Sequence, residues 1–104
     1  MNFSTANTQA PTATGACVND DFLTVELSDG RTIAAPIAWY PRLAHGGAEE
    51  RNHWRLIGGG RGVRWPDLDE DISVENLLAG RASDESQTSL KHWLEQRMEK
   101  PNGD

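Results

Sequence analysis

The chain has 104 residues, enough for one domain with a modest hydrophobic core and too few for two ordinary ones. Its formal net charge of −6 at pH 7 disfavours non-specific binding to the phosphates of nucleic acids and favours a basic protein partner. No apolar run approaches the roughly 18 residues that cross a bilayer, and the N-terminus lacks the basic start and apolar stretch of a secretion signal. We therefore expect a cytoplasmic protein.

The N-terminal segment differs in composition from the rest. Residues 1–15 are mostly small or polar, and such a segment buries too little apolar surface to offset the entropy of ordering it. We expect a disordered leader over 1–15, a folded domain over 16–80, and a linker with a C-terminal helix over 81–104. The single cysteine, Cys17, lies at the start of the first expected strand, where we expect a buried or half-buried structural thiol.

Alternating residues predict a three-stranded meander after the leader. A short strand is expected over 16–19, and Leu23, Val25 and Leu27 then alternate with polar residues, as in a strand with one face in water. The pair Asp29-Gly30 follows at once and is typical of a type I′ hairpin turn, after which residues 31–35 return as the third strand.

Two short helices are expected next. Pro41 suits the first turn of a helix that covers roughly 42–44, and a second helix is expected from Ala48 to about Ile57. The glycines over 58–62 precede a strand and lack the Lys-Ser/Thr of a phosphate-binding loop. They are interpreted as a helix-to-strand turn.

The segment 62–80 predicts a strand, an acidic loop and a short helix. Residues 62–65 alternate as a strand that Pro66 ends, and apolar residues from Ile72 onwards recur at helical spacing as far as Gly80. A last helix is expected over 83–100, capped by Ser83 or Asp84. The fold class is therefore α+β, with a small antiparallel meander, a further strand, short helices and a C-terminal helix.

The acidic loop of residues 67–71 is the first candidate for chemistry. Asp67, Asp69 and Asp71 have the spacing that opens a calcium loop, but Ile72 and Leu78 occupy the positions that need glycine and glutamate. Asp67 and Asp69 are instead expected to cap the turn after Pro66, and Asp71 or Ser73 is expected to cap the following helix. The loop acids are also expected to form ion pairs with arginines. The first expected partners are Arg42 and Arg51, followed by Arg55.

Neither a metal site nor a catalytic site is predicted. The three histidines, His45, His53 and His92, lack the spacing of a zinc site, and one cysteine cannot complete a four-ligand site. No nucleophile elbow or similar signature is present. We therefore assign no catalytic residue, no metal ligand and no cofactor.

The four tryptophans, Trp39, Trp54, Trp65 and Trp93, are a large number for this length. Each brings a large apolar area and one hydrogen-bond donor, so a place in the core is the default. Trp65 could alternatively stack on a guanidinium or contact a partner.

Several blocks of residues resemble one family. They are Leu27–Arg31, Trp39–Leu43, Glu50–Asn52 with Trp54, Trp65–Ser73 and Leu77–Gly80, and together they are similar to the bacterial family called domain of unknown function 2442. The resemblance covers about 16–80 and implies a small α+β domain without an established activity. It also implies a place in small operons, some in a presumed toxin–antitoxin arrangement, and some relatives carry a helix-turn-helix after the domain. The chain departs from the family pattern at Arg64, where a histidine is common.

We therefore expect a non-catalytic protein-binding module, antitoxin-like or regulatory, in a small bacterial operon. The alternative is a DNA-binding regulator, and an enzyme of unknown reaction is the third reading. The candidates for partner contacts or structural ion pairs are Asp67, Asp69, Glu70, Asp71, Arg42, Arg51, Arg55, Arg64 and Trp65.

A homodimer through the C-terminal helix is also expected. Leu90, Trp93, Leu94 and Met98 share one face of that helix and must be covered. The helix could cover them on its own domain, but pairing with a second copy is favoured because a domain that ends at Gly80 already looks complete.

Overall fold

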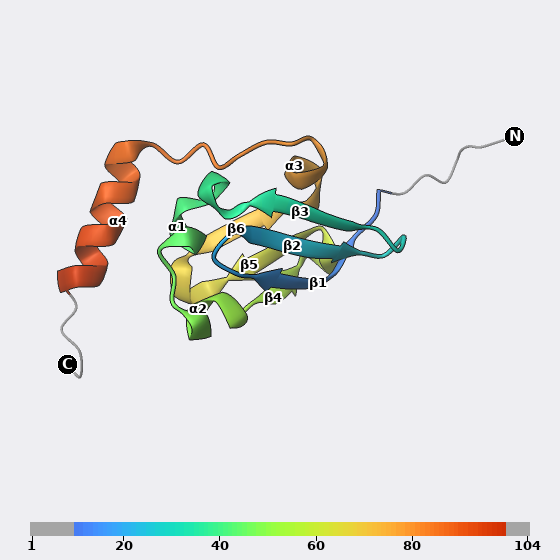
Figure 1. Cartoon of the computed structure of the whole chain (residues 1–104), viewed down its shortest axis with the longest axis horizontal. Coiled ribbons are helices and arrows are strands. Elements are labelled where there is room, and N and C mark those ends of the chain that lie inside the picture. The colour runs from blue at the N-terminus through green and yellow to red at the C-terminus, as the bar shows by residue number, and fades with distance from the viewer. Residues whose placement is uncertain (1–9, 100–104) are drawn as a thin grey trace, which may run out of the picture.

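The computed structural model describes residues 10–99, and Figure 1 shows two small antiparallel sheets, one behind the other, with short helices around them. This architecture confirms the α+β class. Residues 1–9 of the expected leader, and Lys100 at the end of the last expected helix, lie outside the described residues. None of the described helices is long and apolar enough to cross a membrane.

The first sheet is the predicted meander. It consists of β1 (Ala13–Val18), β2 (Phe22–Leu27) and β3 (Thr32–Pro36) in the order β1-β2-β3. Leu23, Val25 and Leu27 of β2 point inward and are buried, as their alternation predicts. The inner row continues across the sheet because Leu23 pairs with Ala35 of β3, which is also buried.

Strand β1 differs from the prediction in two respects. It begins at Ala13 and not at Ala16, so the last residues of the expected leader pair with β2 as far as Leu27. Cys17 is exposed, which corrects the expected buried thiol. Ala16 and Val18 pack against the core, and side chains alternate along a strand, so the residue between them must face outward.

The hairpin between β2 and β3 has a three-residue loop in place of the predicted type I′ turn. Gly30 has a φ of 94°, whereas Asp69 is the only non-glycine residue with a positive φ among residues 10–99. The Gly30 N–H donates to the Leu27 carbonyl at 3.0 Å, and the Leu27 N–H donates to the Arg31 carbonyl at 2.8 Å. Only the glycine of the Asp29-Gly30 pair therefore adopts the left-handed conformation.

Three short helical segments follow β3. They are η2 (Ile37–Trp39), α1 (Pro41–Ala44) and α2 (Ala48–Asn52). The second expected helix was wrong beyond Asn52, because Arg55–Ile57 forms strand β4 and pairs with the next strand. Tertiary pairing has overridden the local helical pattern here.

The second sheet contains β4, β5 (Gly62–Trp65) and β6 (Glu70–Ser73) in that order. The glycine-rich segment, with η3 at Gly58–Gly60, therefore joins two strands and not a helix to a strand. The expected acidic loop is also shorter, since η4 (Pro66–Leu68) and Asp69 make the turn and β6 begins at Glu70. A strand replaces the start of the expected helix because Glu70 to Ser73 pair with β5.

Two helices complete the chain. Helix α3 (Val74–Leu78) begins after Ser73, whose hydroxyl accepts the Asn76 N–H at 3.0 Å. Helix α4 (Gln87–Glu99) begins later than expected. Its cap is Ser86, which accepts the Ser89 N–H at 3.0 Å, and not Ser83 or Asp84. Figure 1 shows α4 at one end of the molecule, beside α1 and α2.

The core lies between the two sheets. Leu23 and Val25 from the first sheet and Val63 and Trp65 from the second are fully buried. The Trp65 indole N–H donates to the Arg51 carbonyl at 3.0 Å, so its one polar group is satisfied. The inner positions of two half-buried sheets therefore build one core.

Candidate functional site

Arg42 organises the largest group of charged side chains in the structure. Helix α1 directs it toward the start of α4, where its Nε donates to both carboxylate oxygens of Glu85 at 3.0 Å and its Nη2 donates to one of them at 2.6 Å. Its Nη1 donates to the Asp69 carbonyl at 3.0 Å and lies 3.6 Å from the Asp69 carboxylate. The guanidinium therefore joins α1, the acidic turn and the segment before α4.

The pair of Arg42 and Glu85 is well shielded. Only 15% of the Arg42 side chain and 10% of the Glu85 side chain are exposed. Hydrogen bonds from Arg42 lower the pKa of Glu85 below its ordinary value, although burial opposes this effect. Such a fork-shaped contact is among the stronger charge-assisted hydrogen bonds.

The acidic turn is held from its other side by Arg64 of β5. Its two terminal nitrogens contact Asp71 at 2.7 Å and Asp69 at 3.1 Å. Asp69 is left-handed, with a φ of 51°, which directs its carbonyl toward Arg42 and its carboxylate toward Arg64. Asp69 and Asp71 nevertheless remain 71% and 55% exposed.

Glu70 lies between these two acids in a different environment. Burial raises the pKa of Glu70 to about 7; the positive charge of Arg42 opposes this rise, and the neighbouring acids Glu85, Asp71 and Asp69 add to it. Among the described residues Glu70 forms no ion pair. It is therefore the carboxyl of this group that carries a proton most readily near neutral pH.

Trp93 of α4 lies between two arginines. The guanidinium carbon of Arg42 is 4.9 Å from the Trp93 ring centroid, and that of Arg97 is 4.7 Å away. Arg97 in turn donates to the two carboxylate oxygens of Glu50 at 2.9 and 3.1 Å. These contacts hold α4 against the rest of the molecule.

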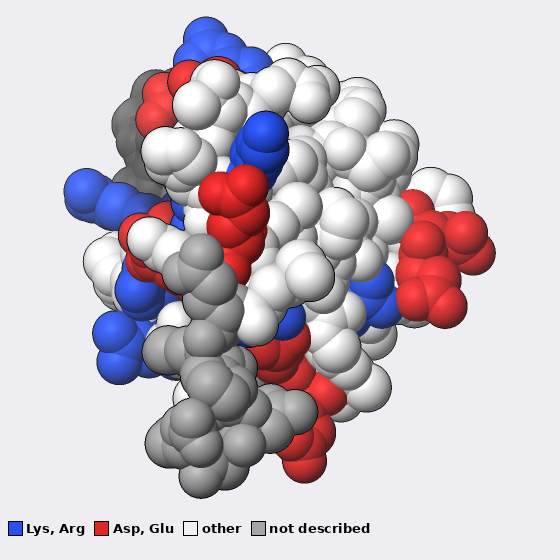
Figure 2. All heavy atoms as spheres, turned by 90° about the vertical axis from the view of Figure 1, so that its left-hand side faces the viewer, with Lys and Arg blue, Asp and Glu red and all other residues white. Residues whose placement is uncertain are grey.

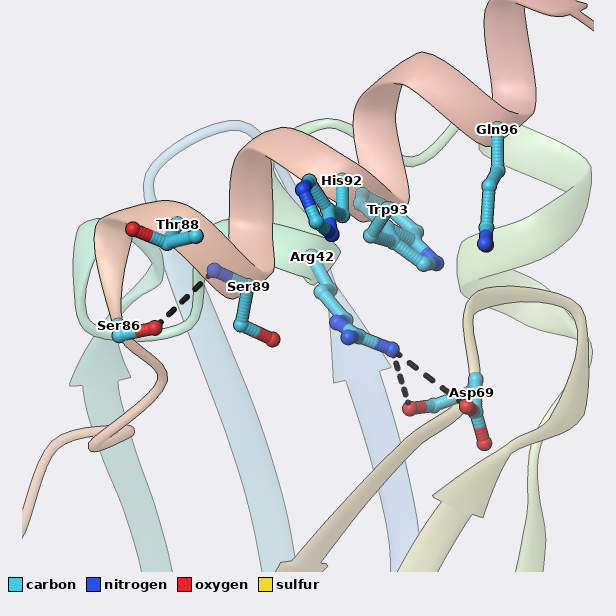
Figure 3. A pocket seen from close by; sticks show the side chains of 8 residues that line it. All are labelled: Arg42, Asp69, Ser86, Thr88, Ser89, His92, Trp93 and Gln96. Atoms are coloured by element: carbon cyan, nitrogen blue, oxygen red, sulfur yellow. Dashed lines mark hydrogen bonds and ion pairs between the residues drawn. The ribbon is translucent and has the colours of Figure 1, made fainter.

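A hollow of about 460 Å³ opens beside this contact (Figure 3). Arg42, Asp69 and Trp93 form its inner side, and His92 and Gln96 of α4 extend along it with the hydroxyl residues at the helix start. The hollow is open to solvent and mixes cationic, anionic and aromatic groups, which suits contact with a protein side chain. No group of three or more His, Cys, Asp or Glu side chains within residues 10–99 is arranged to hold a metal ion.

The other predicted ion pairs differ from expectation. Arg51 does not reach the acidic turn; it donates to Asp20 at 2.8 Å and to the carbonyls of Leu43 and Ala44. These carbonyls end α1, and a guanidinium satisfies them well. In the described part of the chain, Arg55 forms no ion pair.

Asp67 also contacts a residue that the sequence analysis did not pair with it. Its carboxylate lies 2.8 Å from His53 Nδ1, at an exposed position. Trp65, a candidate for stacking or partner contact, is fully buried instead.

The candidate face for self-association is divided by the fold. Trp93 is 9% exposed, and Leu90 and Leu94 pack partly against the domain's own core. Met98 is 85% exposed. Trp93 is therefore covered by its own chain, whereas Met98 and the exposed parts of Leu90 and Leu94 remain available.

Sequence reasoning did not identify Glu85, Glu50 and Arg97 as site residues. Glu85 and Arg42 are 43 positions apart, and Arg97 and Glu50 are 47 positions apart, so no local spacing reveals either pair. One feature of the sequence could have pointed to Arg97. It follows Trp93 by four positions, which places both side chains on one face of the helix. Figure 2 shows that acidic and basic side chains lie next to one another on the face that carries α4.

The sequence matches the family described as "Protein of unknown function (DUF2442)" over residues 16–83. The chain belongs to this family. The matched DUF2442 domain includes both sheets beyond the first residues of β1 and the acidic turn, but it ends before α4. No curated protein matches the sequence.

Two solved structures resemble this DUF2442 chain. A protein of unknown function from Rhodospirillum rubrum ATCC 11170 is 26% identical with a TM-score of 0.63, over 77% of this chain and 96% of that one. An uncharacterised protein from Chromobacterium violaceum, solved by NMR, is 19% identical with a TM-score of 0.61, over 78% of this chain and 75% of that one. Both share the fold, and neither comes with a described activity.

Proposed function

We propose that this DUF2442 protein is a non-catalytic protein-binding module, regulatory or antitoxin-like, that contacts a basic partner through the acidic turn. The observation that carries the proposal is that Arg64 fixes Asp69 and Asp71 while more than half of each acidic side chain stays exposed. Acids that are already ordered lose less conformational entropy when a partner binds. The net charge of −6 favours the approach of a basic surface.

A DNA-binding regulator is less well supported. Such a protein needs arginines that are free to contact phosphates. Arg42, Arg51 and Arg64 already donate to carboxylates or carbonyls of the same chain. Two further arginines of the same region, Arg55 and Arg61, are exposed, and DNA binding would depend on them.

Position-specific photo-crosslinking in cells that carry the native gene tests the proposal. A photoreactive residue replaces Asp71 in one protein and Glu26, an exposed residue of β2, in the matched control. We expect a protein adduct from position 71 that is lost when Asp69→Asn is added, and none of that mass from position 26. The same adducts from both positions would contradict the assigned surface, and an adduct to DNA would favour the regulator.

The proposal also includes homodimerisation, through a smaller face than the sequence predicted. With Trp93 covered, the remaining face consists of Leu90, Leu94 and Met98 along one side of α4. Sedimentation of the wild type and of Met98→Glu at high micromolar concentration tests it. A monomeric wild type would overturn the dimer and leave the acidic turn as the proposed contact surface.

A further inference from the structure

Helix α4 lies on a surface that the family domain provides. The matched residues end at 83, whereas α4 begins at Gln87. Arg42 and Glu50, which contact α4 from the other side, both belong to the matched domain. The structure therefore shows what kind of segment this surface of the domain accepts.

The contacts define the chemistry of that segment. Trp93 stacks on Arg42, and Arg97 pairs with Glu50 through two hydrogen bonds. Trp93 and Arg97 are four positions apart and so lie on one face of the helix. Ahead of the helix, Glu85 accepts hydrogen bonds from Nε and Nη2 of Arg42. An aromatic ring, an arginine one turn later and a preceding carboxylate are thus the recognised groups.

Helix α4 is attached by side-chain contacts and not by strand pairing. Among residues 87–98 of α4 only Trp93 is buried, and Leu90 and Leu94 are half-buried. The pair of Arg97 and Glu50 is 30% and 28% exposed, and neither sheet takes a strand from this part of the chain. The linker residues 79–82 are exposed. Helix α4 can therefore leave its place without breaking a strand pairing.

We propose that the surface formed by Arg42 and Glu50 is a helix-binding site, which α4 fills within the same chain and from which a partner protein's helix displaces it. The partner helix carries an aromatic side chain, an arginine one turn later and a carboxylate ahead of both. This inference rests on the proposed protein-binding function, and it adds that α4 controls access to the helix-binding site. A competitor must overcome the high effective concentration of a tethered α4, on the order of millimolar for a short flexible linker.

The test uses a fluorescein-labelled synthetic peptide of residues 83–99 and the full-length chain. Fluorescence anisotropy measures peptide binding to the wild type and to Trp93→Ala, whose own α4 has lost its aromatic anchor. We expect Trp93→Ala to bind the peptide at least about tenfold more tightly than the wild type, because the tethered competitor is weakened. The same peptide with its tryptophan replaced by alanine is expected to lose most of this affinity.

A matched pair of second substitutions locates the site. Adding Glu50→Gln to Trp93→Ala is expected to reduce peptide affinity about tenfold, as the loss of a charge-assisted contact would. Adding Glu75→Gln, an equal charge change at an exposed residue of α3, is expected to leave affinity within about twofold.

Equal peptide affinity for the wild type and Trp93→Ala would overturn the inference, as would equal effects of the two second substitutions. If Trp93→Ala loses the sheet signals in an NMR spectrum, Arg97→Ser takes its place, since it removes the contacts of Arg97 with Glu50 and with the Trp93 ring but leaves the buried indole. No partner protein takes part in this assay. Its failure therefore leaves the crosslinking result standing, and a failed crosslink leaves this result standing.

Discussion

The guanidinium carbon of Arg42 lies 4.9 Å from the ring centroid of Trp93, while its nitrogens donate to Glu85 at 2.6 to 3.0 Å. One side chain from a four-residue helix thus contacts both α4 and the segment that leads into it. A cation over an indole face is attracted by the ring quadrupole, and shielding from water strengthens that attraction. Arg42 is therefore a direct link between α4 and the domain.

Replacing Arg42 by lysine should loosen α4 although the charge is kept. Lysine cannot form the fork-shaped contact with Glu85 or stack as a plane on Trp93, so we expect a loss of about 1–3 kcal/mol in the free energy of unfolding. Urea denaturation measures this loss, and hydrogen exchange of the α4 amides should accelerate. Arg31→Lys is the control, because Arg31 pairs with Asp29 at the surface, where water screens the pair, so its effect should be clearly smaller. Equal effects of the two substitutions would contradict the role assigned to Arg42.

Gly60 should tolerate alanine less well than Gly59. Both have a positive φ, 93° and 67°, but a Cβ on Gly60 would lie 2.9 Å from Thr12 Cβ and 3.0 Å from the Ala13 carbonyl oxygen. A Cβ on Gly59 meets nothing within 4 Å. We expect Gly59→Ala to cost about 1 kcal/mol from backbone strain alone and Gly60→Ala about 2–4 kcal/mol, because a steric clash is added. Thermal unfolding of the two variants gives the comparison, and similar melting temperatures would argue against the close approach of β1.

Glu70 should make stability fall as the pH rises from about 4.5 to about 7. Burial raises the pKa of Glu70 to about 7 from an ordinary value of 4.5, so across that interval the folded protein binds a proton that the unfolded chain has released. Above pH 7 the buried charge costs stability, and we expect Glu70→Gln to be more stable than the wild type by about 1–2 kcal/mol at pH 8. The gain should shrink toward pH 5, where the wild-type carboxyl is protonated.

Denaturation curves measured between pH 5 and pH 8 test this dependence. Glu75→Gln removes one negative charge from the surface of α3 and corrects for the change in net charge. A constant difference between Glu70→Gln and the wild type across this range would show that Glu70 does not bind a proton there.

The turn at Asp69 should depend on backbone conformation more than on charge. Its φ of 51° is costly for most side chains but accessible to asparagine and glycine. We expect Asp69→Ala to cost about 1–2 kcal/mol, whereas Asp69→Asn and Asp69→Gly should each cost less than about half of that. Differential scanning calorimetry of the three variants separates the effects. If all three lose the same stability, the ion pairs with Arg64 and Arg42 dominate instead.

Features that depend on local interactions could be predicted from the sequence. The alternation of Leu23, Val25 and Leu27 predicts a strand with one buried face, and Pro66 predicts the end of the strand before it. The hairpin at Gly30 and the cap at Ser73 were likewise expected from neighbouring residues, although the predicted type I′ turn was wrong. These features depend on backbone preferences that act over a few positions.

Other features depend on contacts between segments that are far apart in the sequence. Arg55–Ile57 fits a helix by itself, but it is a strand because β5 offers hydrogen bonds to it. Glu85 was expected in the first turn of the last helix with no assigned role, and the fold instead brings it to Arg42, 43 positions away. An ion pair or a strand pairing requires only proximity in space, so the spacing of residues along the chain does not reveal it. The tertiary structure alone decided which charges, and which face of α4, remain exposed.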